Sequence, residues 1–219
     1  MDDMKKYIFF DLDGTLTASG PGIINAVNYV LKEFGIDVKD KNELISFIGP
    51  PLEESFIKFY HFDELKAKEA SIKFREYYLK TGIYESSLYE GVDAMLKTLK
   101  EHGLKLMIAT AKQEEQAIHV LQYFNIDKYF TFVGGCEPDK RITKGDVIRY
   151  VLKENEISNL DEVLMVGDRE NDISGAKENG IECLSVLYGY GSEEEFKEAG
   201  TDYIVETVSD VVDKIIKWK

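Results

Sequence analysis

The 219-residue sequence predicts an α/β fold with a mostly parallel sheet and a helical domain inserted after the first strand. Two patterns lead to this fold class. Short, almost continuously apolar runs alternate with amphipathic stretches over most of the chain, which is typical of strands covered on both faces by helices. Between Ala18 and Ile83 the alternation stops, and only helical patterns occur. We therefore expect a parallel-sheet core formed by residues 1–16 and 84–219 and a helical domain at residues 17–83.

The expected strands are short and rich in β-branched or aromatic residues. In chain order they are YIFF (7–10), LKLMIAT (104–110), FTFVGG (130–135), VLMVGD (163–168), IECLSVLYG (181–189) and DYIVE (202–206). The segment 91–103 before the second strand is expected to be a helix, because its apolar residues fall on one stripe. Gly103 suits the position that follows a helix, as do Gly35 and Gly180 after two other helical segments.

The inserted domain is expected to consist of helices that pack through apolar stripes. One stripe comprises Ile24, Val27, Leu31 and Phe34. The long helical segment 63–82 provides a second stripe, which comprises Leu65, Ile72, Tyr78 and Leu79. Between the two segments, the Gly-Pro-Pro at residues 49–51 predicts a turn with a proline at the first position of the next helix.

Composition limits the classes of partner. The net charge of −14 argues against nucleic acid polymers, because binding to a phosphate backbone needs clustered Lys and Arg. No stretch approaches the ~20 apolar residues of a membrane-spanning helix, and the N-terminal apolar run is shorter than the core of a signal peptide. Cys136 and Cys183 lack any metal-binding or redox spacing, so we expect them to be small buried residues in a reducing compartment. We expect a soluble, cytoplasmic protein.

Two aspartates follow the first expected strand, in the stretch FFDLDGTLT (9–17). Residues two apart in a strand point to the same face, so Asp11 and Asp13 repel each other unless a cation or a proton lies between them. The carboxyl edge of a parallel sheet is also where ligand sites form. A turn with a helix cap explains Asp13 and Gly14 but leaves Asp11 unexplained. We interpret Asp11 as a nucleophile or metal ligand and Asp13 as its acid–base partner.

Thr110 ends the second expected strand. Its hydroxyl and the backbone N–H groups that follow, beginning with Ala111, form a small anion-binding turn if a helix starts there. A simple helix N-cap explains Thr110 equally well. Lys112 is expected to be a solvated residue in the first turn of that helix.

Lys144 stands at the start of the helical segment that follows the strand 130–135. A lysine is unfavourable beside the positive end of a helix, so its position there favours an anionic partner. Lys140 and Arg141 lie in the loop before it and are rivals for the same role.

Two more aspartates follow the fourth expected strand. Asp168 comes directly after Gly167, and Asp172 follows about one helical turn later. Two carboxylates that converge on one point suit a hard divalent cation, which prefers oxygen ligands. A turn and a helix cap account for either residue alone but not readily for both.

In this order, the four stretches resemble the motifs of the haloacid dehalogenase-like superfamily of phosphohydrolases. The matching residues are DxDGT at 11–15, Thr110, Lys144 and GDxxxD at 167–172. The resemblance spans the whole chain, and FIGPPLEESF (47–56) and VLYGYGSEEEFKEAGTDYIVE (186–206) are similar to its phosphoglycolate phosphatase-like branch. It implies a Rossmann-like catalytic core and a helical cap of the C1 type, in which SFIGPPLE (46–53) is expected to reach the substrate. Many relatives carry an Asp-Ser pair where this chain has Ala18-Ser19.

The resemblance also implies a role for each residue. Asp11 attacks phosphorus and becomes an aspartyl-phosphate, while Asp13 protonates the leaving alcohol and then takes a proton from water. The phosphoryl oxygens have three expected partners, Thr110, Ala111 and Lys144. The cofactor Mg²⁺ has four expected ligands, namely Asp11, Asp13 through its backbone carbonyl, Asp168 and Asp172.

A count of formal charges is consistent with these roles. Three aspartates contribute one negative charge each, Lys144 and Mg²⁺ together contribute three positive charges, and Asp13 is neutral while it acts as an acid. Without the metal the sum is negative, and the site repels a phosphate dianion. We therefore expect Mg²⁺ to be obligatory.

The expected activity is the hydrolysis of a small phosphomonoester, such as phosphoglycolate or a 5′-nucleotide. Asp13 favours phosphoryl transfer over dehalogenation, since the dehalogenases of the superfamily lack an aspartate at that place. A sugar phosphomutase of the β-phosphoglucomutase type shares the core motifs and stays open as an alternative. A receiver-type switch or a catalytically silent phosphate- and metal-binding protein is a more distant one. The only expected partner is the small-molecule substrate, without nucleic acid or membrane, and the chain is expected to be a monomer or a weak homodimer.

Overall fold

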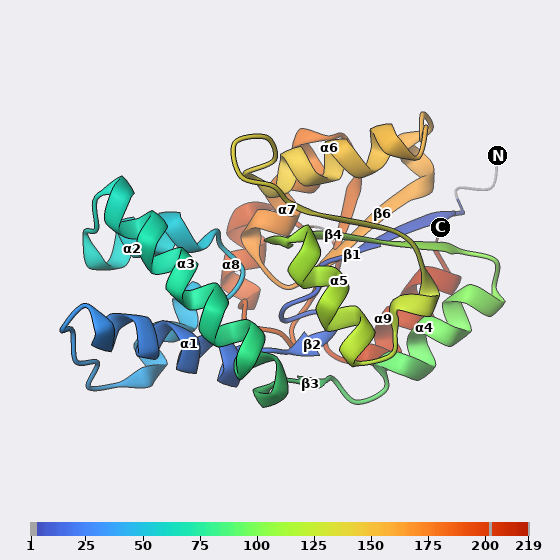
Figure 1. The fold of residues 1–219 in the computed structure, drawn as a ribbon. Helices are drawn as coiled ribbons and strands as arrows, with labels where there is room; N and C mark the ends of the chain where they lie inside the picture. Colours follow the sequence, from blue (N-terminus) through green and yellow to red (C-terminus); the bar gives the residue numbers. More distant parts are fainter. Residues whose placement is uncertain (1–3, 202, 219) are drawn as a thin grey trace. The chain divides into compact units, whose positions relative to one another are not determined.

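The computed structural model describes residues 4–201 and 203–218. It divides into two compact units (Figure 1), one formed by Met1–Leu16 with Leu88–Lys219 and the other by Thr17–Ser87. We call these the core unit and the helical unit. The short strands β2 (Thr17–Ala18) and β3 (Ser87–Leu88) pair with each other where the chain leaves and re-enters the core unit.

The core unit contains a six-stranded sheet, which confirms the predicted α/β fold class (Figure 1). Its strands are β1 (Tyr7–Phe10), β4 (Lys105–Gln113), β5 (Phe130–Cys136), β6 (Val163–Gly167), β7 (Glu182–Val186) and β8 (Tyr203–Val205). They lie in the order β5-β4-β1-β6-β7-β8, and each neighbouring pair is parallel. Asp202, with which the last predicted strand begins, lies outside the described residues.

Helices cover both faces of this sheet (Figure 1). On one face, α6 (Lys144–Glu154), α7 (Glu170–Glu178) and α8 (Glu193–Ala199) pack over a buried cluster that includes Phe9, Met107 and Met165. On the other face lie α4 (Val92–Glu101), α5 (Glu114–Tyr123) and α9 (Val208–Ile216). Short 3₁₀ segments, η3 (Asp127–Tyr129) and η4 (Leu160–Glu162), precede β5 and β6. The apolar runs of β1, β4, β6 and β7 are nearly continuous because most of their residues are buried on both faces of the sheet, whereas the edge strands β5 and β8 are only partly buried.

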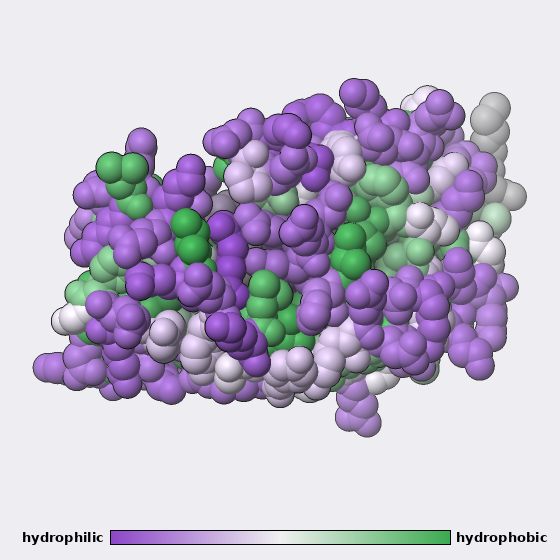
Figure 2. All heavy atoms as spheres, viewed as in Figure 1, coloured by the Kyte–Doolittle hydropathy of each residue, from purple (hydrophilic) through white to green (hydrophobic). Residues whose placement is uncertain are grey.

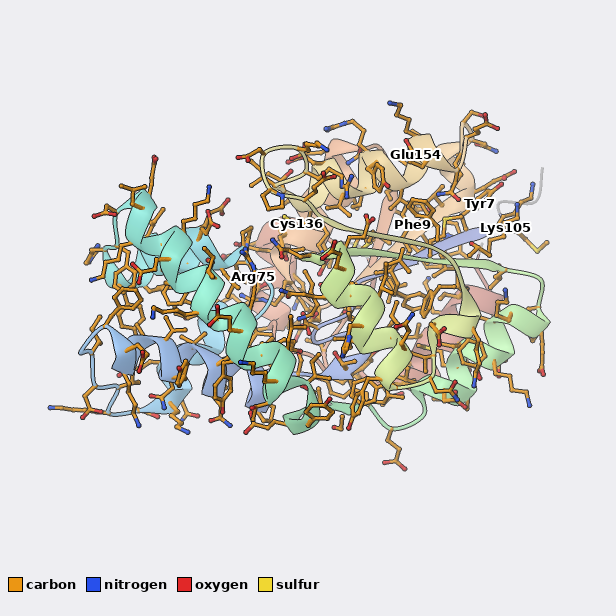
Figure 3. The ribbon with its side chains drawn as sticks, in the orientation of Figure 1. Tyr7, Phe9, Arg75, Lys105, Cys136 and Glu154 are labelled. Carbon is orange, nitrogen blue, oxygen red and sulfur yellow. The ribbon has the colours of Figure 1, made fainter. Side chains whose placement is uncertain are left out.

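The parallel register sets which ends of the strands meet. Tyr7 on β1 and Lys105 on β4 are partners at the amino ends of their strands (Figure 3), with the Lys105 Nζ atom 5.2 Å from the centre of the Tyr7 ring. Because β1 lies between β4 and β6, the carboxyl ends of these three strands share the opposite edge. The chain crosses from one side of β1 to the other between β5 and β6, and such a switch point is where open α/β sheets form ligand sites.

The helical unit contains three helices. They are α1 (Gly20–Glu33), α2 (Leu52–Tyr60) and α3 (Glu64–Lys80), with 3₁₀ segments η1 (Lys41–Phe47) and η2 (Gly82–Glu85). An aromatic cluster forms its interior, in which Phe56 contacts Phe47 edge-on and stacks on Phe62. Pro51 caps α2 instead of occupying its first position, because the helix begins at Leu52.

The predicted apolar stripe on α3 is largely wrong. Leu65, Ile72 and Leu79 are 83%, 48% and 39% exposed, and of the four predicted residues only Tyr78 is buried. The buried face of α3 consists of Ala67, Ala70, Ser71, Phe74 and Tyr78. Its small residues allow α3 to lie close to α1 and α2, which it contacts. Helical periodicity groups residues on a face but does not tell which face the rest of the unit covers.

The surface agrees with the charged composition. The face drawn in Figure 2 is covered mainly by hydrophilic residues. None of the helices within residues 4–201 and 203–218 has the length and apolar character needed to cross a bilayer. Cys183 is buried as predicted, whereas Cys136 at the end of β5 (Figure 3) is only partly buried, because the strand ends there in a loop.

Candidate active site

Asp11 follows β1 directly and is fixed by main-chain contacts. Its N–H donates to the Val166 carbonyl at 2.9 Å, so the chain stays aligned with β6 one residue beyond β1. Its Oδ1 atom accepts from the Leu12 N–H at 2.7 Å and lies 2.9 Å from the Lys144 Nζ atom. The Asp11 side chain is 2% exposed. A buried, oriented carboxylate thus stands at the switch point of the sheet.

Lys144 is the first residue of α6, whose start is fixed by a capping box between Thr143 and Asp146. Its Nζ atom lies 2.7 Å from Asp172 Oδ1, in addition to Asp11, and donates to the Ala109 carbonyl at 3.2 Å. Burial alone would lower the pKa of Lys144, but the charges of Asp11 and Asp172 raise it above its ordinary value. Lys144 therefore stays protonated in the interior.

The two rival cations of the preceding loop lie elsewhere. Lys140 is exposed and pairs with Glu137 at 2.6 Å. Arg141 lies 2.9 Å from Glu114 and 2.9 Å from Glu137. The structure thus brings Lys144 to the aspartates and pairs Lys140 and Arg141 with glutamates.

Asp168 and Asp172 come together as the sequence indicates. Asp172 lies in the first turn of α7, and its Oδ2 atom accepts from the N–H groups of Asp168 and Arg169, both at 3.1 Å. Asp168 Oδ1 accepts from the Thr15 hydroxyl at 3.0 Å, and its Oδ2 atom accepts from the Tyr190 N–H at 2.8 Å. The turn before α7 therefore orients Asp172, and the segments of Thr15 and Tyr190 together orient Asp168.

Three buried carboxylates form a set that fits a metal ion. Asp11, Asp168 and Asp172 each offer one oxygen, and these oxygens lie within 4.8 Å of one another. Burial, together with the charges of its neighbours, raises the pKa of Asp168 well above its ordinary value. Burial also raises the pKa of Asp172 to about 6, although Lys144 opposes the rise. One ammonium cannot balance three carboxylates, and an all-oxygen set with excess negative charge is what a hard divalent cation requires.

Asp13 forms an ion pair with a different lysine, Lys112. Its Oδ2 atom lies 2.8 Å from the Nζ atom of Lys112, and the Lys112 side chain is 5% exposed. The prediction of a solvated Lys112 is therefore wrong. β4 continues to Gln113 and α5 begins only at Glu114, so Lys112 belongs to extended chain rather than to an exposed helical turn. The adjacent acidic residues at 114 and 115 were the signal for the true helix start, since acidic side chains favour the first turn.

Thr110 and Ala111 lie on β4 beside the cluster. Thr110 is buried, and its Oγ1 atom accepts from the Lys112 N–H at 3.3 Å. Ala111 is half-buried. Neither residue starts a helix, contrary to prediction, but both follow Ala109, whose carbonyl accepts from Lys144. The structure thus gathers Asp11, Lys144 and the two later aspartates at one point, with Thr110 one residue away along β4.

Two tyrosines that the sequence reasoning left without a role support this edge of the sheet. The Tyr188 hydroxyl donates to the Thr15 carbonyl at 3.0 Å, and its ring meets that of Tyr89 edge-on, 5.0 Å between centres. Burial, and then the charge of Asp168, raise the pKa of Tyr188, so the hydroxyl keeps its proton and donates. Tyr190 holds Asp168 through its backbone N–H. The sequence signal was the stretch LYGYG, whose glycines mark close backbone approach.

Gly14 shows how tightly the backbone encloses Asp168. It has a φ of +86°, and a Cβ atom there would lie 2.0 Å from Asp168 Oδ2. Gly189 approaches Asp168 from another side, with a Cβ position 2.3 Å from its Cβ atom. A side chain at either position would displace the carboxylate.

We expect Gly14→Ala to lower kcat/KM for phosphate release by at least about 100-fold, because Asp168 must move for the methyl group to fit. Gly103→Ala is the matched control, since Gly103 has a φ of +81° but nothing within 4 Å of its Cβ position. The control should show only the backbone strain of an L-residue at positive φ, about 1 kcal/mol, or roughly 2–4 °C in Tm. Equal activities and equal Tm values for the two variants would contradict the close packing at Gly14.

Comparisons with known proteins agree with this site. A family model described as haloacid dehalogenase-like hydrolase matches residues 8–186. A 5′-nucleotidase of Pseudomonas aeruginosa is 40% identical over 191 residues, 87% of this chain and 86% of that protein. A phosphoglycolate phosphatase of Vibrio vulnificus is 31% identical over 222 residues, 96% of each chain. A protein of Mycobacterium tuberculosis named tyrosine-protein kinase PtkA is 32% identical over 209 residues, 94% of this chain and 70% of that protein.

A solved structure gives the same result for the fold. A crystal structure described as a predicted phosphatase from Clostridium acetobutylicum is 41% identical and superposes with a TM-score of 0.95, over 98% of this chain and 99% of that one. These findings confirm the predicted family and the predicted enzyme class. The chain belongs to the haloacid dehalogenase-like hydrolase family and is an enzyme of its phosphatase type.

Proposed function

We propose that the protein is a Mg²⁺-dependent phosphomonoesterase that acts through an aspartyl-phosphate on Asp11. One observation carries the proposal: the two carboxyls of the Asp-Leu-Asp stretch have separate partners. Asp11 lies with Lys144 among the aspartates that we propose to bind the metal, and Asp13 lies with Lys112. A nucleophile must stay ionised near positive charge, whereas an acid–base group must be free to exchange a proton.

The proposed reaction has two steps. In the first, an Asp11 carboxylate oxygen bonds to phosphorus, the bond to the leaving oxygen breaks, and Asp13 gives that oxygen a proton. In the second, Asp13 takes a proton from water, the water oxygen bonds to phosphorus, and the bond to Asp11 breaks. Thr110, Ala111 and Lys144 hold the phosphoryl oxygens. When bound by Asp11, the Asp13 carbonyl, Asp168 and Asp172, Mg²⁺ supplies positive charge against the phosphoryl group.

Lys112 adds one positive charge to the count on which the need for a metal rests. Asp13 and Lys112 form a neutral pair, so Asp13 need not be protonated for the site to balance. The excess negative charge of Asp11, Asp168 and Asp172 over Lys144 is unchanged. Without a metal the site therefore sums to −2 when Asp13 is ionised and to −1 when Asp13 is protonated, so the argument for a divalent cation holds in both states.

The names of the relatives support a small phosphorylated metabolite as substrate, phosphoglycolate or a 5′-nucleotide. We further propose that the helical domain of residues 17–83 serves as the cap that selects it, with SFIGPPLE (46–53) as the contact segment. Within that segment, Phe47 is committed to the interior of the helical unit through Phe56 and Phe59. We propose that the Gly-Pro-Pro turn at residues 49–51, which is only partly buried, is the part that meets the substrate.

A phosphate-release screen tests the proposal. Phosphoglycolate, nucleoside 5′-monophosphates and hexose phosphates are offered with Mg²⁺ and, in parallel, with EDTA. We expect phosphate release from at least one of them, with Mg²⁺ only. A hexose phosphate that is isomerised without release of phosphate would instead indicate the phosphomutase. No turnover of any member with Mg²⁺ would contradict the proposal.

A further inference from the structure

Lys112 is a buried cation beside the reaction centre for which the proposed mechanism has no role. Its side chain is 5% exposed, and that of its partner Asp13 is 11% exposed. A buried lysine loses both rotamer freedom and hydration, so its contact with Asp13 must offset both losses. Exposed ion pairs contribute little to the stability of a protein. The cost of burying Lys112 therefore suggests a role for this pair other than stabilising the fold.

The two oxygens of Asp13 have different surroundings. Oδ2 lies 2.8 Å from the Lys112 Nζ atom. Oδ1 is buried and has no hydrogen-bond partner in the described parts of the chain. A buried carboxylate oxygen without a partner is destabilising, and native proteins keep few of them. The lysine thus fixes one oxygen and leaves the other available.

The backbone holds Lys112 in this place. Its N–H donates to Thr110 Oγ1 at 3.3 Å, at a point where the ladder between β4 and β5 is irregular. Gly135 on β5 allows the close approach, since a Cβ atom there would lie 2.7 Å from the Lys112 carbonyl oxygen and 2.5 Å from the Glu114 backbone. The backbone from which the Lys112 side chain extends is therefore held in place by the sheet.

We propose that Lys112 is a positioning residue that orients Asp13 so that Oδ1 is the oxygen that exchanges the proton. The inference rests on the proposed function, in which Asp13 gives a proton to the leaving oxygen and later takes one from water. Lys112 donates to Oδ2 throughout and transfers no proton itself. Without it, the carboxyl rotates among orientations, and only a fraction of them presents a proton to the leaving group.

The test compares leaving groups. Propyl phosphate leaves as an alkoxide that needs a proton, whereas p-nitrophenyl phosphate leaves as a stable phenolate that does not. We expect Lys112→Met to lower kcat/KM by about 100-fold for propyl phosphate, the lower range for general acid catalysis, and by less than about 5-fold for p-nitrophenyl phosphate. Asp13→Asn should show the same selective loss. Lys112→Arg, which keeps the charge and donors, should recover most of the activity towards propyl phosphate.

Controls separate this inference from the proposed function. Lys97→Met removes a lysine that is 66% exposed on α4 and should leave both rates and Tm unchanged. If Asp13→Asn shows the selective loss but Lys112→Met lowers kcat/KM equally for both substrates, the positioning role is wrong and the proposed function stands. If Asp13→Asn shows no selectivity, the proposed function itself is contradicted. If Lys112→Met does not fold, Lys112→Arg decides, because a selective loss in that folded variant would overturn the inference.

A substrate-binding role for Lys112 predicts a different pattern. In that case, a substrate with an anionic leaving group, such as the phosphate monoester of 3-hydroxypropionate, should lose more in KM than an alkyl phosphate whose leaving alcohol is uncharged and equally basic. We expect instead that Lys112→Met lowers kcat/KM equally for the two substrates, because the loss depends only on the basicity of the leaving oxygen. A loss that tracks the charge of the leaving group would overturn the positioning role.

Discussion

Asp11→Asn is expected to lower kcat by about 10⁴-fold or more, the range seen when an enzyme loses its nucleophile. The amide keeps the shape of the side chain and its contact with the Leu12 N–H, but its oxygen is a poor nucleophile at phosphorus. The variant should also fail to form the covalent intermediate. Acid-quenched wild-type enzyme incubated with substrate and Mg²⁺ should gain the mass of one phosphoryl group on the peptide that contains Asp11, and the variant should gain none.

Asp127→Asn is the matched control, because Asp127 is exposed at the surface of the core unit. It should retain full activity and full labelling. Phosphoryl label on a residue other than Asp11, or turnover by Asp11→Asn within about 10-fold of wild type, would remove Asp11 from the role of nucleophile.

Removal of the metal is expected to abolish activity and to lower Tm together. The pKa values of Asp168 and Asp172 are raised by burial and by neighbouring charge, so ionised carboxylates are held together at neutral pH at a cost in stability. A bound divalent cation removes that cost. At a concentration about 100 times its Kd, Mg²⁺ should add about 2.7 kcal/mol, which corresponds to roughly 5–10 °C in Tm for a chain of this size.

Asp168→Asn distinguishes this cause from a general salt effect. Its amide can face the Thr15 hydroxyl while its oxygen still accepts from the Tyr190 N–H, so the fold should be kept. We expect the variant to melt a few degrees higher than wild type in EDTA, roughly 2–4 °C for 1 kcal/mol, and to lose the rise in Tm with Mg²⁺. A full Mg²⁺-dependent shift in this variant would show that Asp168 is not a ligand.

The parts of the fold that depend on local pattern could be predicted from sequence. The strand ending at Phe10 and the helix starting at Lys144 have sharp local signals, an apolar run that stops at a carboxylate and a capping box. Once each is placed on a parallel sheet, convergence at one edge follows from topology alone. Asp11, Lys144 and the later aspartates were therefore within reach of sequence reasoning.

Features that depend on a distant neighbour could not be predicted in this way. The position of Lys112 depends on how far β4 extends beside β5, and the failed α3 stripe depends on which face α1 covers. The contact between Tyr188 and Thr15 joins residues far apart in the sequence. The oligomeric state and the domain limits at residues 17 and 83 stay predictions.

The position of Lys144 constrains how this chain can change over evolutionary time. From the first position of α6, its ammonium contacts Asp11 after β1, the Ala109 carbonyl on β4 and Asp172 on α7. The contacts of this one atom therefore connect four elements. Loss of the lysine alone would leave two buried aspartates uncompensated, at about 3–5 kcal/mol, a large part of the stability of an ordinary domain. A variant that loses Lys144 therefore needs compensating changes at Asp11 and Asp172, so these three residues are constrained to change together.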